Sequence, residues 1–337
     1  MKQDRILLAH GAGGKLSATL TEQVFLKHFR DPALLELNDM AVLDVPAGKL
    51  AISTDSYVIT PIFFPGGDIG SLAVNGTVND VAMSGARPFA MSVGFILEEG
   101  LEINQLEQIV ASMARAALLA CVRIVTADTK VVSKGAADRM FINTTGFGII
   151  DRGFTLGGQG AKPGDAVLVS GTVGDHGIAV ASGRSGIALS TPVESDCAAL
   201  NGLIGSLLDK LGPDVHALRD PTRGGLGTVL NEIAFQSQVG VDIREEAVPV
   251  REAVRGACEL LGYDHLYLAN EGKLVAFVEG KRAQEALAVM KSHPLGKEAV
   301  LLGSAVLEHP GKVVMQTALG GRRLVDRLTG EMLPRIC

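Results

Sequence analysis

Tryptophan is absent from this 337-residue chain, and aromatic residues make up only 4% of it. Its core must therefore be aliphatic, and stacking of nucleic-acid bases on aromatic side chains is not expected. The formal net charge is −6 and no long run of Lys or Arg occurs. A nucleic-acid partner would need a basic face that this balance does not provide. We therefore expect no nucleic-acid partner.

Long apolar runs are also missing. None approaches the ~20 residues of a membrane-spanning helix, and the run near the amino terminus is too short for the core of a signal peptide. The four cysteines are scattered without a C-x-x-C pair, so neither a zinc site nor a disulfide framework is indicated. The sequence predicts a cytoplasmic protein with no membrane partner.

The remaining composition is that of a folded enzyme-sized chain, with 47% hydrophobic and 20% charged residues. This length favours two domains. In the first half, residues 102–120 place apolar side chains at three- and four-residue steps, which predicts a helix. Short apolar runs bounded by Gly, Pro or charge predict strands at 50–54, 89–97, 121–129 and 140–150.

The turn-rich stretch 151–164 fits a domain boundary. Beyond it, apolar runs predict strands at 166–171, 274–278 and 299–307. Helical patterns alternate with them at 175–183, 195–211, 224–237, 250–261 and 281–291. We predict two α+β domains, residues 1–153 and 154–325, followed by a flexible tail over 326–337.

The segment His10–Lys15 (HGAGGK) sets three glycines beside a lysine, ahead of a helix-like segment. Glycine lets the backbone approach a phosphate closely, and Lys15 adds positive charge. The spacing of a Walker A motif is missing. A phosphate-binding loop and a flexible glycine-rich leader are both open interpretations.

Aspartates recur in the first half where an apolar run ends or a polar break begins: Asp39, Asp55, Asp80 and Asp128. Carboxylates gathered at such places can bind Mg²⁺ that is shared with substrate phosphates. For each aspartate alone, a turn or helix-capping role is the competing interpretation. Asn75 and Asn79 are four residues apart, which puts them on one helical face with Asp80 adjacent.

Asp128, Thr129 and Lys130 combine an acid, a hydroxyl and a cation at a strand end, and Lys134 follows shortly after. A lysine beside a bound triphosphate can neutralise charge that develops during phosphoryl transfer. The alternative is a pair of exposed surface lysines.

In the second half, the motif RDPTRGG precedes a helix. Asp220 is a candidate cap and Arg223 a candidate anion contact, and a plain capping loop explains them equally well. Glu271, in NEGKLV at the start of a strand, is a candidate proton acceptor.

The sequence ends in PRIC, with Cys337 as its last residue. A prenylation box needs its cysteine four residues from the end, so that interpretation fails. A cysteine on a mobile terminus can be incidental. Because an exposed free thiol is a liability, we favour a tethered nucleophile.

Together, these segments resemble the HypE family of hydrogenase maturation carbamoyl dehydratases, from about residue 5 to residue 337. The motifs that carry the resemblance are HGAGGK, STDSYV, VNDVAMSGARP, ADTKVV, RDPTRGG, NEGKLV, SHPLGK and PRIC. The family lies within the superfamily of aminoimidazole ribonucleotide synthetase, the PurM-like proteins. Selenophosphate synthetase and thiamine-monophosphate kinase share the motifs in altered form, so the PRIC ending is what points to HypE-like proteins. The glycine-rich segment has no cysteine here, which argues against selenophosphate synthesis.

The resemblance implies a two-domain PurM-like α+β fold whose amino-terminal domain pairs with its mate in a homodimeric β-barrel-like core. ATP would bind near that interface, with Mg²⁺ held by the aspartates Asp39, Asp55, Asp80 and Asp128. The other implied nucleotide contacts are Lys15, Asn75, Asn79, Thr129, Asp220 and Arg223.

The implied chemistry starts with a HypF-like partner that places a carbamoyl group on Cys337. ATP would phosphorylate the carboxamide oxygen, and loss of phosphate would leave a thiocyanate. Glu271 would be the base, with Lys130, or Lys134 in second place, stabilising charge. The cyanide would pass to iron on a HypC–HypD-like scaffold, for a nickel–iron hydrogenase. Two alternatives stay open: a PurM-like ATP-dependent enzyme acting on a free small molecule, and a nucleotide-binding scaffold with a docking tail.

Overall fold

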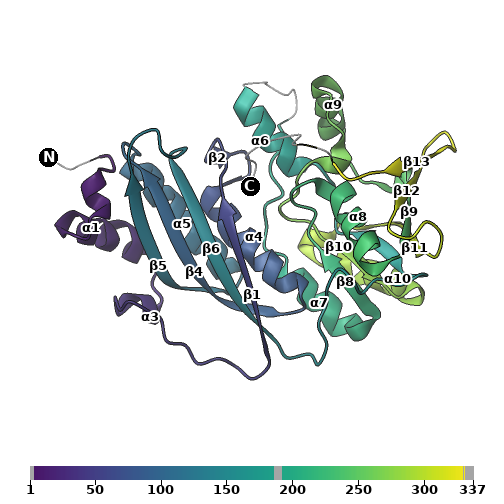
Figure 1. Ribbon diagram of the computed structural model, residues 1–337, viewed down its shortest axis with the longest axis horizontal. Helices are drawn as coiled ribbons and strands as arrows, with labels where there is room; N and C mark the ends of the chain where they lie inside the picture. The colour runs from purple at the N-terminus through teal and green to yellow at the C-terminus, as the bar shows by residue number, and fades with distance from the viewer. Residues whose placement is uncertain (1–3, 186–191, 329, 331–337) are drawn as a thin grey trace.

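Two sheets stand side by side, and helices cover each of them (Figure 1). The computed structural model describes residues 4–185, 192–328 and 330. Among these, the first sheet has the strand order β1-β6-β4-β5 and the second has the order β13-β12-β9-β11-β7-β10-β8. A short pair, β2 (Phe63–Phe64) and β3 (Gly67–Asp68), lies in the sequence between β1 and β4 of the first sheet.

The first sheet is covered by helices on one face only. Its strands are β1 (Lys49–Tyr57), β4 (Arg87–Glu98), β5 (Arg123–Val132) and β6 (Met140–Ile150). Helices α4 (Ile69–Met83) and α5 (Ile103–Leu119) pack on the inner face, where they share one aliphatic core with Tyr57, Val93 and Phe95. The other face carries the exposed side chains of Leu50, Ile52 and Ile96.

The amino-terminal segment packs along the β5 edge of this sheet. It forms α1 (Lys15–Leu20), a π-helical turn (Thr21–Phe25), α2 (Leu26–His28) and α3 (Pro32–Leu35). Phe25 packs against Phe95 of β4 with ring centroids 5.0 Å apart. The Asp31 carboxylate caps α3 through Ala33 N and accepts from Arg123 Nε at 2.6 Å. The hydrogen bond from Arg123 lowers the pKa of Asp31, so this pair fixes the segment to the sheet at neutral pH.

In the second sheet, strands β7, β8 and β10 are buried on both faces, whereas β13 is mostly exposed. The strands of this sheet are β7 (Ala166–Val169), β8 (Val215–Arg219), β9 (Gly240–Arg244), β10 (Val275–Val278), β11 (Val300–Val306), β12 (Val313–Gln316) and β13 (Arg322–Val325). The helices around it are α6 (Asp175–Ser185), α7 (Asn201–Leu211), α8 (Gly225–Ser237), α9 (Glu252–Leu261) and α10 (Ala283–Ser292). Strands β7 and β8 both run antiparallel to β10. The carboxyl ends of β7 and β8 therefore lie beside the amino end of β10, at the same end of these three strands.

The predicted strands and the helix of the first half are confirmed in type. The helix predicted over residues 195–211 is wrong for its first six residues, because α7 begins only at Asn201. Residues 192–200, here named the strap, are irregular. Several of their backbone groups bond to neighbouring elements: Ser195 N donates to Pro65 O (2.8 Å), and Ala198 N donates to Glu271 O (3.3 Å).

No range was predicted for helix α4, because its buried side includes polar residues such as Asn75, Thr77 and Asn79 as well as apolar ones. Nearly all of its residues are buried between the first sheet, α5 and α7, so it has no polar face from which a helical period could be read. In the part of the chain that the structure describes, no helix combines the length and apolar character needed to cross a bilayer.

Candidate active site at the junction of the two domains

Four carboxyl groups gather where the two sheets meet. Asp55 comes from β1 and Asp80 from α4, while Asp220 follows β8 and Glu271 precedes β10. Ser53, two residues before Asp55 and on the same face of β1, donates from Oγ to Asp80 Oδ2 at 2.9 Å. The structure therefore brings together acidic residues that lie far apart in the sequence and that we had predicted one by one.

The electrostatics of this acidic cluster show a shortage of positive charge. Burial first and the charge of Asp80 second raise the pKa of Asp220 to about 7. Burial, then the charges of Asp220 and Asp196, raise the pKa of Glu271 well above its usual range. Arg223 Nη2 lies 3.6 Å from Asp55 Oδ1, and its side chain is mostly exposed. Arg219 also acts on Asp80 and Asp220, but it is itself paired with Glu232. The carboxyls therefore keep a net negative charge, and they form a donor set suited to a hard cation such as Mg²⁺.

One side of the cluster is buried, and the other is open to solvent and is called its mouth. Glu271 is only 2% exposed, and its Oε1 atom has no hydrogen-bond partner among the described residues. Asp80 and Arg223, by contrast, reach solvent. A buried polar atom without a partner is costly. We infer that Glu271 faces the place where a ligand group binds.

The strap holds Glu271 in position. Asp196 Oδ1 accepts from Glu271 N, and Asp196 Oδ2 accepts from Lys273 Nζ, both at 3.0 Å. A Cβ atom on Gly272, between them, would lie 1.8 Å from Asp196 O, so only glycine allows this approach. Sequence reasoning named Glu271 and missed its neighbours, although the glycine in NEGK was a visible signal.

Asn79 ties the strap to the first domain. Its Nδ2 donates to Ala198 O at 3.0 Å, and its Oδ1 accepts from Leu200 N at 2.7 Å. Both ends of this amide are thus engaged with backbone. Asn75, one turn earlier on the same face of α4, instead donates from Nδ2 to Cys197 Sγ at 3.4 Å. The sequence had indicated no role for Cys197.

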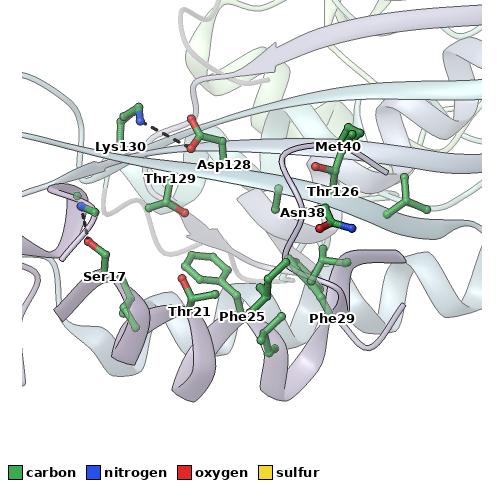
Figure 2. Close-up of a pocket in the computed structure, with 18 of the residues that line it drawn as sticks. Ser17, Thr21, Phe25, Phe29, Asn38, Met40, Thr126, Asp128, Thr129 and Lys130 are labelled. Atoms are coloured by element: carbon green, nitrogen blue, oxygen red, sulfur yellow. Dashed lines mark hydrogen bonds and ion pairs between the residues drawn. The ribbon is translucent and has the colours of Figure 1, made fainter. Parts of the chain in front are cut away.

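A second concave site lies at the far edge of the first sheet. It is a pocket of about 300 Å³ between the amino-terminal segment and β5 (Figure 2). Its apolar side is lined by Leu20, Phe25, Phe29, Leu34 and Met40. Its polar rim holds His10, Ser17, Thr21, Asn38, Thr126, Asp128, Thr129 and Lys130. We call it the edge pocket.

Three of the predicted site residues belong to this edge pocket. Asp128 and Lys130 are largely exposed, with Lys130 Nζ 3.8 Å from Asp128 Oδ1, and Thr129 lies between them. Lys15 and Asp39 are exposed nearby, at the start of α1 and beside the lining residue Asn38.

Lys134 stands apart from the other predicted catalytic residues. It lines a different cavity, which also includes Arg5 and Glu98. Hydrogen bonds from Gly135 N and Arg139 N, and then the charge of Lys134, lower the pKa of Glu98. Of the two candidate lysines, only Lys130 is a lining residue of the edge pocket.

The acidic cluster and the edge pocket do not meet within one chain. Strands β1 and β5 are the two edges of the first sheet, with β6 and β4 between them. Asp55 is in register with Thr144, Val93 and Ala127 on the helix-covered face. Asp128 is the next residue along β5 and points to the opposite, open face. Cys337 lies outside the described residues.

Comparisons with known proteins agree with this architecture. The family model "AIR synthase related protein, N-terminal domain" matches residues 37–150, and its C-terminal counterpart matches residues 162–316. These models define the class as AIR synthase-related, or PurM-like, proteins. A thiamine-monophosphate kinase from Stenotrophomonas maltophilia shares the fold, with a TM-score of 0.61 and 22% identity over 83% of this chain and 89% of its own.

Within that class the similarity is specific. The carbamoyl dehydratase HypE of Azotobacter vinelandii is 50% identical over 100% of this chain and 98% of its own length. A crystal structure of the hydrogenase maturation protein HypE in complex with ATP matches with a TM-score of 0.94 and 55% identity, covering 98% of this chain and 99% of that one. A HypE–HypF complex matches with a TM-score of 0.81 and 49% identity, over 92% of this chain and 99% of that one. The chain belongs to the HypE family of carbamoyl dehydratases.

Proposed function

We propose that this chain uses ATP to dehydrate an S-carboxamide carried on Cys337, leaving a thiocyanate that supplies cyanide to the iron of a nickel–iron hydrogenase. The family membership supports the reaction class. The single structural observation that carries it is Glu271, a buried carboxyl whose Oε1 atom has no hydrogen-bond partner among the described residues, set beside an acidic cluster that suits nucleotide-bound Mg²⁺. The relatives in complex with ATP and with HypF support ATP as co-substrate and a HypF-like carbamoyltransferase as loading partner. A HypC–HypD-like scaffold would receive the cyanide, in the cytoplasm.

The reaction balances without a further reactant. The carboxamide oxygen attacks the γ-phosphorus of ATP, and ADP leaves. The C–O bond then breaks, the oxygen departs as part of inorganic phosphate, and the nitrogen loses its two protons as C≡N forms. Phosphorylation is needed because it converts oxygen into a good leaving group. Glu271 would accept a proton from nitrogen.

The acidic cluster would serve the phosphates. Asp55, Asp80 and Asp220 are the residues that would hold Mg²⁺. The pKa values of Asp80 and Asp220 are raised by burial and by the charges of neighbouring carboxyls, so a cation close by would stabilise the ionised forms. When bound, the cation neutralises negative charge on the transferring phosphoryl group. Arg223 adds positive charge at the open mouth.

The edge pocket would hold the nucleoside end of ATP. Its apolar side suits a base, and its hydroxyl-rich rim suits ribose and phosphate. Lys130 would stabilise charge from this side, with Lys134 in second place. Lys15 and Thr129 would contact phosphate at the rim, and Asp39 and Asp128 would supply further carboxylates for Mg²⁺.

A second copy of the chain would bring the two sites together. The open face of the first sheet carries exposed Leu50, Ile52 and Ile96 around a row of Thr and Ser hydroxyls, so it is apolar enough to be covered. In a two-fold pair of such sheets, the β5 edge of one subunit can lie against the β1 edge of the other. The homodimer would thus form a barrel-like core. The proposed domain division at residue 153 follows the gap between the two sheets.

Mixed dimers test this shared site. Asp80→Asn and Asp128→Asn homodimers are each expected to be inactive. After subunit exchange in equal amounts, half of the dimers are mixed and carry one intact site of two, which gives about a quarter of wild-type activity. No recovery after verified exchange would show that each site is built from one chain.

The chemistry itself is tested by mass spectrometry of Cys337 after incubation with a HypF-like partner, carbamoyl phosphate and ATP. We expect a carbamoyl adduct that loses one water only when ATP is present. Cys337→Ala is the control. ATP-dependent turnover of a small molecule that persists in Cys337→Ala would contradict the carrier role and favour the small-molecule alternative.

A further inference from the structure

Cys197 and Asn75 form one side of the acidic cluster, and neither side chain carries the positive charge that a phosphate contact would supply. The Asn75 amide donates to Cys197 Sγ at 3.4 Å, and the charge of Glu271 reaches the same thiol. Cys197 N is held by Ser195 Oγ at 3.1 Å, and the next residue bonds to Glu271 O. The strap therefore sets the thiol beside both Asn75 and Glu271. These groups come from α4, the strap and the segment before β10.

We propose that Asn75, Cys197 and Glu271 line the subsite for the neutral carboxamide, with Cys197 acting as a positioning residue that orients the Asn75 amide. This assignment rests on the proposed function. A primary carboxamide offers one C=O acceptor and two N–H donors, and an asparagine amide beside a carboxyl presents the complementary set. A phosphate oxygen at the same place would find no positive charge among these three side chains. Asn75 thus faces the carboxamide end of the reactants and not the triphosphate.

The weakness of sulfur as a hydrogen-bond acceptor fits this role. The contact to Sγ fixes the direction of the Asn75 amide, and its Oδ1 atom has no partner within the described ranges. That oxygen is therefore free to accept from a carboxamide N–H. A stronger acceptor would hold the amide more tightly, and a methyl group would leave it unfixed.

The thiol must also stay inert next to a thiocyanate. A thiolate would attack the sulfur of R–S–CN, forming a disulfide and expelling cyanide. Burial first, and then the charges of Glu271 and Asp196, raise the pKa of Cys197 well above its usual range. The thiol is therefore protonated at neutral pH and does not compete for the product. Burial and the neighbouring carboxyls together keep this thiol unreactive.

The test uses full-length enzyme preloaded with carbamoyl groups, and it compares Cys197→Ala, Cys197→Ser and Asn75→Ala. Three quantities are measured: the ATP dissociation constant, the single-turnover rate of thiocyanate formation, and the ATP consumed per thiocyanate. Loss of one oriented hydrogen bond should slow Cys197→Ala and Asn75→Ala roughly fivefold to tenfold. ATP affinity should stay within about twofold, and ATP consumed per thiocyanate should rise. Cys197→Ser, whose hydroxyl still accepts from Asn75, should retain most of the rate.

Cys121→Ser, at an exposed thiol outside the site, is the matched control, and thermal unfolding verifies that each variant is folded. Wild-type rates in both alanine variants would overturn the assignment. So would a loss of ATP affinity in Asn75→Ala that equals its loss of rate, because Asn75 would then be a phosphate contact. A wild-type enzyme that never forms thiocyanate would instead refute the proposed function, and the subsite with it.

Discussion

The acidic cluster and the edge pocket are opposites, although the same sheet contributes to both. The cluster gathers like charges around the buried Glu271, and its residues are fixed by the strap and by α4. The edge pocket has an apolar side and exposed charges that pair with each other at 3.8 Å. The first arrangement stores electrostatic repulsion, which a cation and reacting groups can relieve. The second offers apolar surface, which favours binding without chemistry.

This contrast predicts that substitutions in the two places separate rate from affinity. The largest effect is expected for Glu271→Gln. Loss of a positioned base should slow thiocyanate formation by about 10²–10⁴-fold, while ATP affinity is retained. Because the pKa of Glu271 is raised, the wild-type rate should increase with pH well above the range of an ordinary carboxyl group.

A pH–rate profile of both proteins measures this difference, since the variant should lack the rising limb. Glu279→Gln, at a half-exposed glutamate beyond β10, provides the control. Equal rates for wild type and Glu271→Gln would remove the base from the acidic cluster.

An intermediate effect of the reverse kind is expected for Met40→Ser in the edge pocket. Met40 lines the pocket and is 63% exposed, so its replacement should leave the fold intact. Loss of part of its apolar contact should weaken ATP binding by roughly threefold to tenfold. The rate at saturating ATP should not change.

Titration calorimetry and single-turnover kinetics separate the two quantities. Leu319→Ser, at a fully exposed leucine of the second domain, is the control for a general loss of apolar surface. A lower saturated rate with unchanged affinity would place the nucleoside elsewhere.

The smallest effect concerns stability. The pKa of Asp220 is about 7 in the folded protein against 3.8 for the free side chain, so the folded state binds more protons between these values. Stability should therefore fall as pH rises from about 4 to 7. Without ATP or metal, Asp220→Asn should raise the unfolding temperature by a few degrees at pH 8 and by nothing at pH 4. Asp44→Asn, at an exposed loop residue, is the control, and an equal shift at both pH values would argue against relief of repulsion.

Much of the fold was readable from local patterns. Strands such as β4 and β6 are apolar runs bounded by Gly, Pro or charged residues, and α5 has one polar and one apolar face. The sequence pattern alone therefore predicts each of them. Helix α4 has no polar face to reveal it. The pattern over residues 195–211 predicts one helix, but residues 195–200 belong to the strap, whose conformation is set by partners such as Pro65 O and Glu271 O that are remote in sequence.

The candidate site divides in the same way. Single residues such as Glu271 and Asp80 could be named from their polar settings beside apolar runs. Their grouping could not, because strand order decides it: β1 and β5 became opposite edges through long-range pairing. Cys197 gave no local signal at all, since only the strap brings it to Asn75.

The strap has a consequence for the relative motion of the two domains. Because its hydrogen bonds run from α4 to the segment before β10, the two halves are stapled together at the point where the bond-breaking is proposed to occur. In an enzyme with a hinge, one domain closes onto the other around the substrate, whereas here the strap links the two domains directly. The carboxamide must therefore be brought to a site of fixed geometry, so delivery depends on movement of its carrier and not on domain closure.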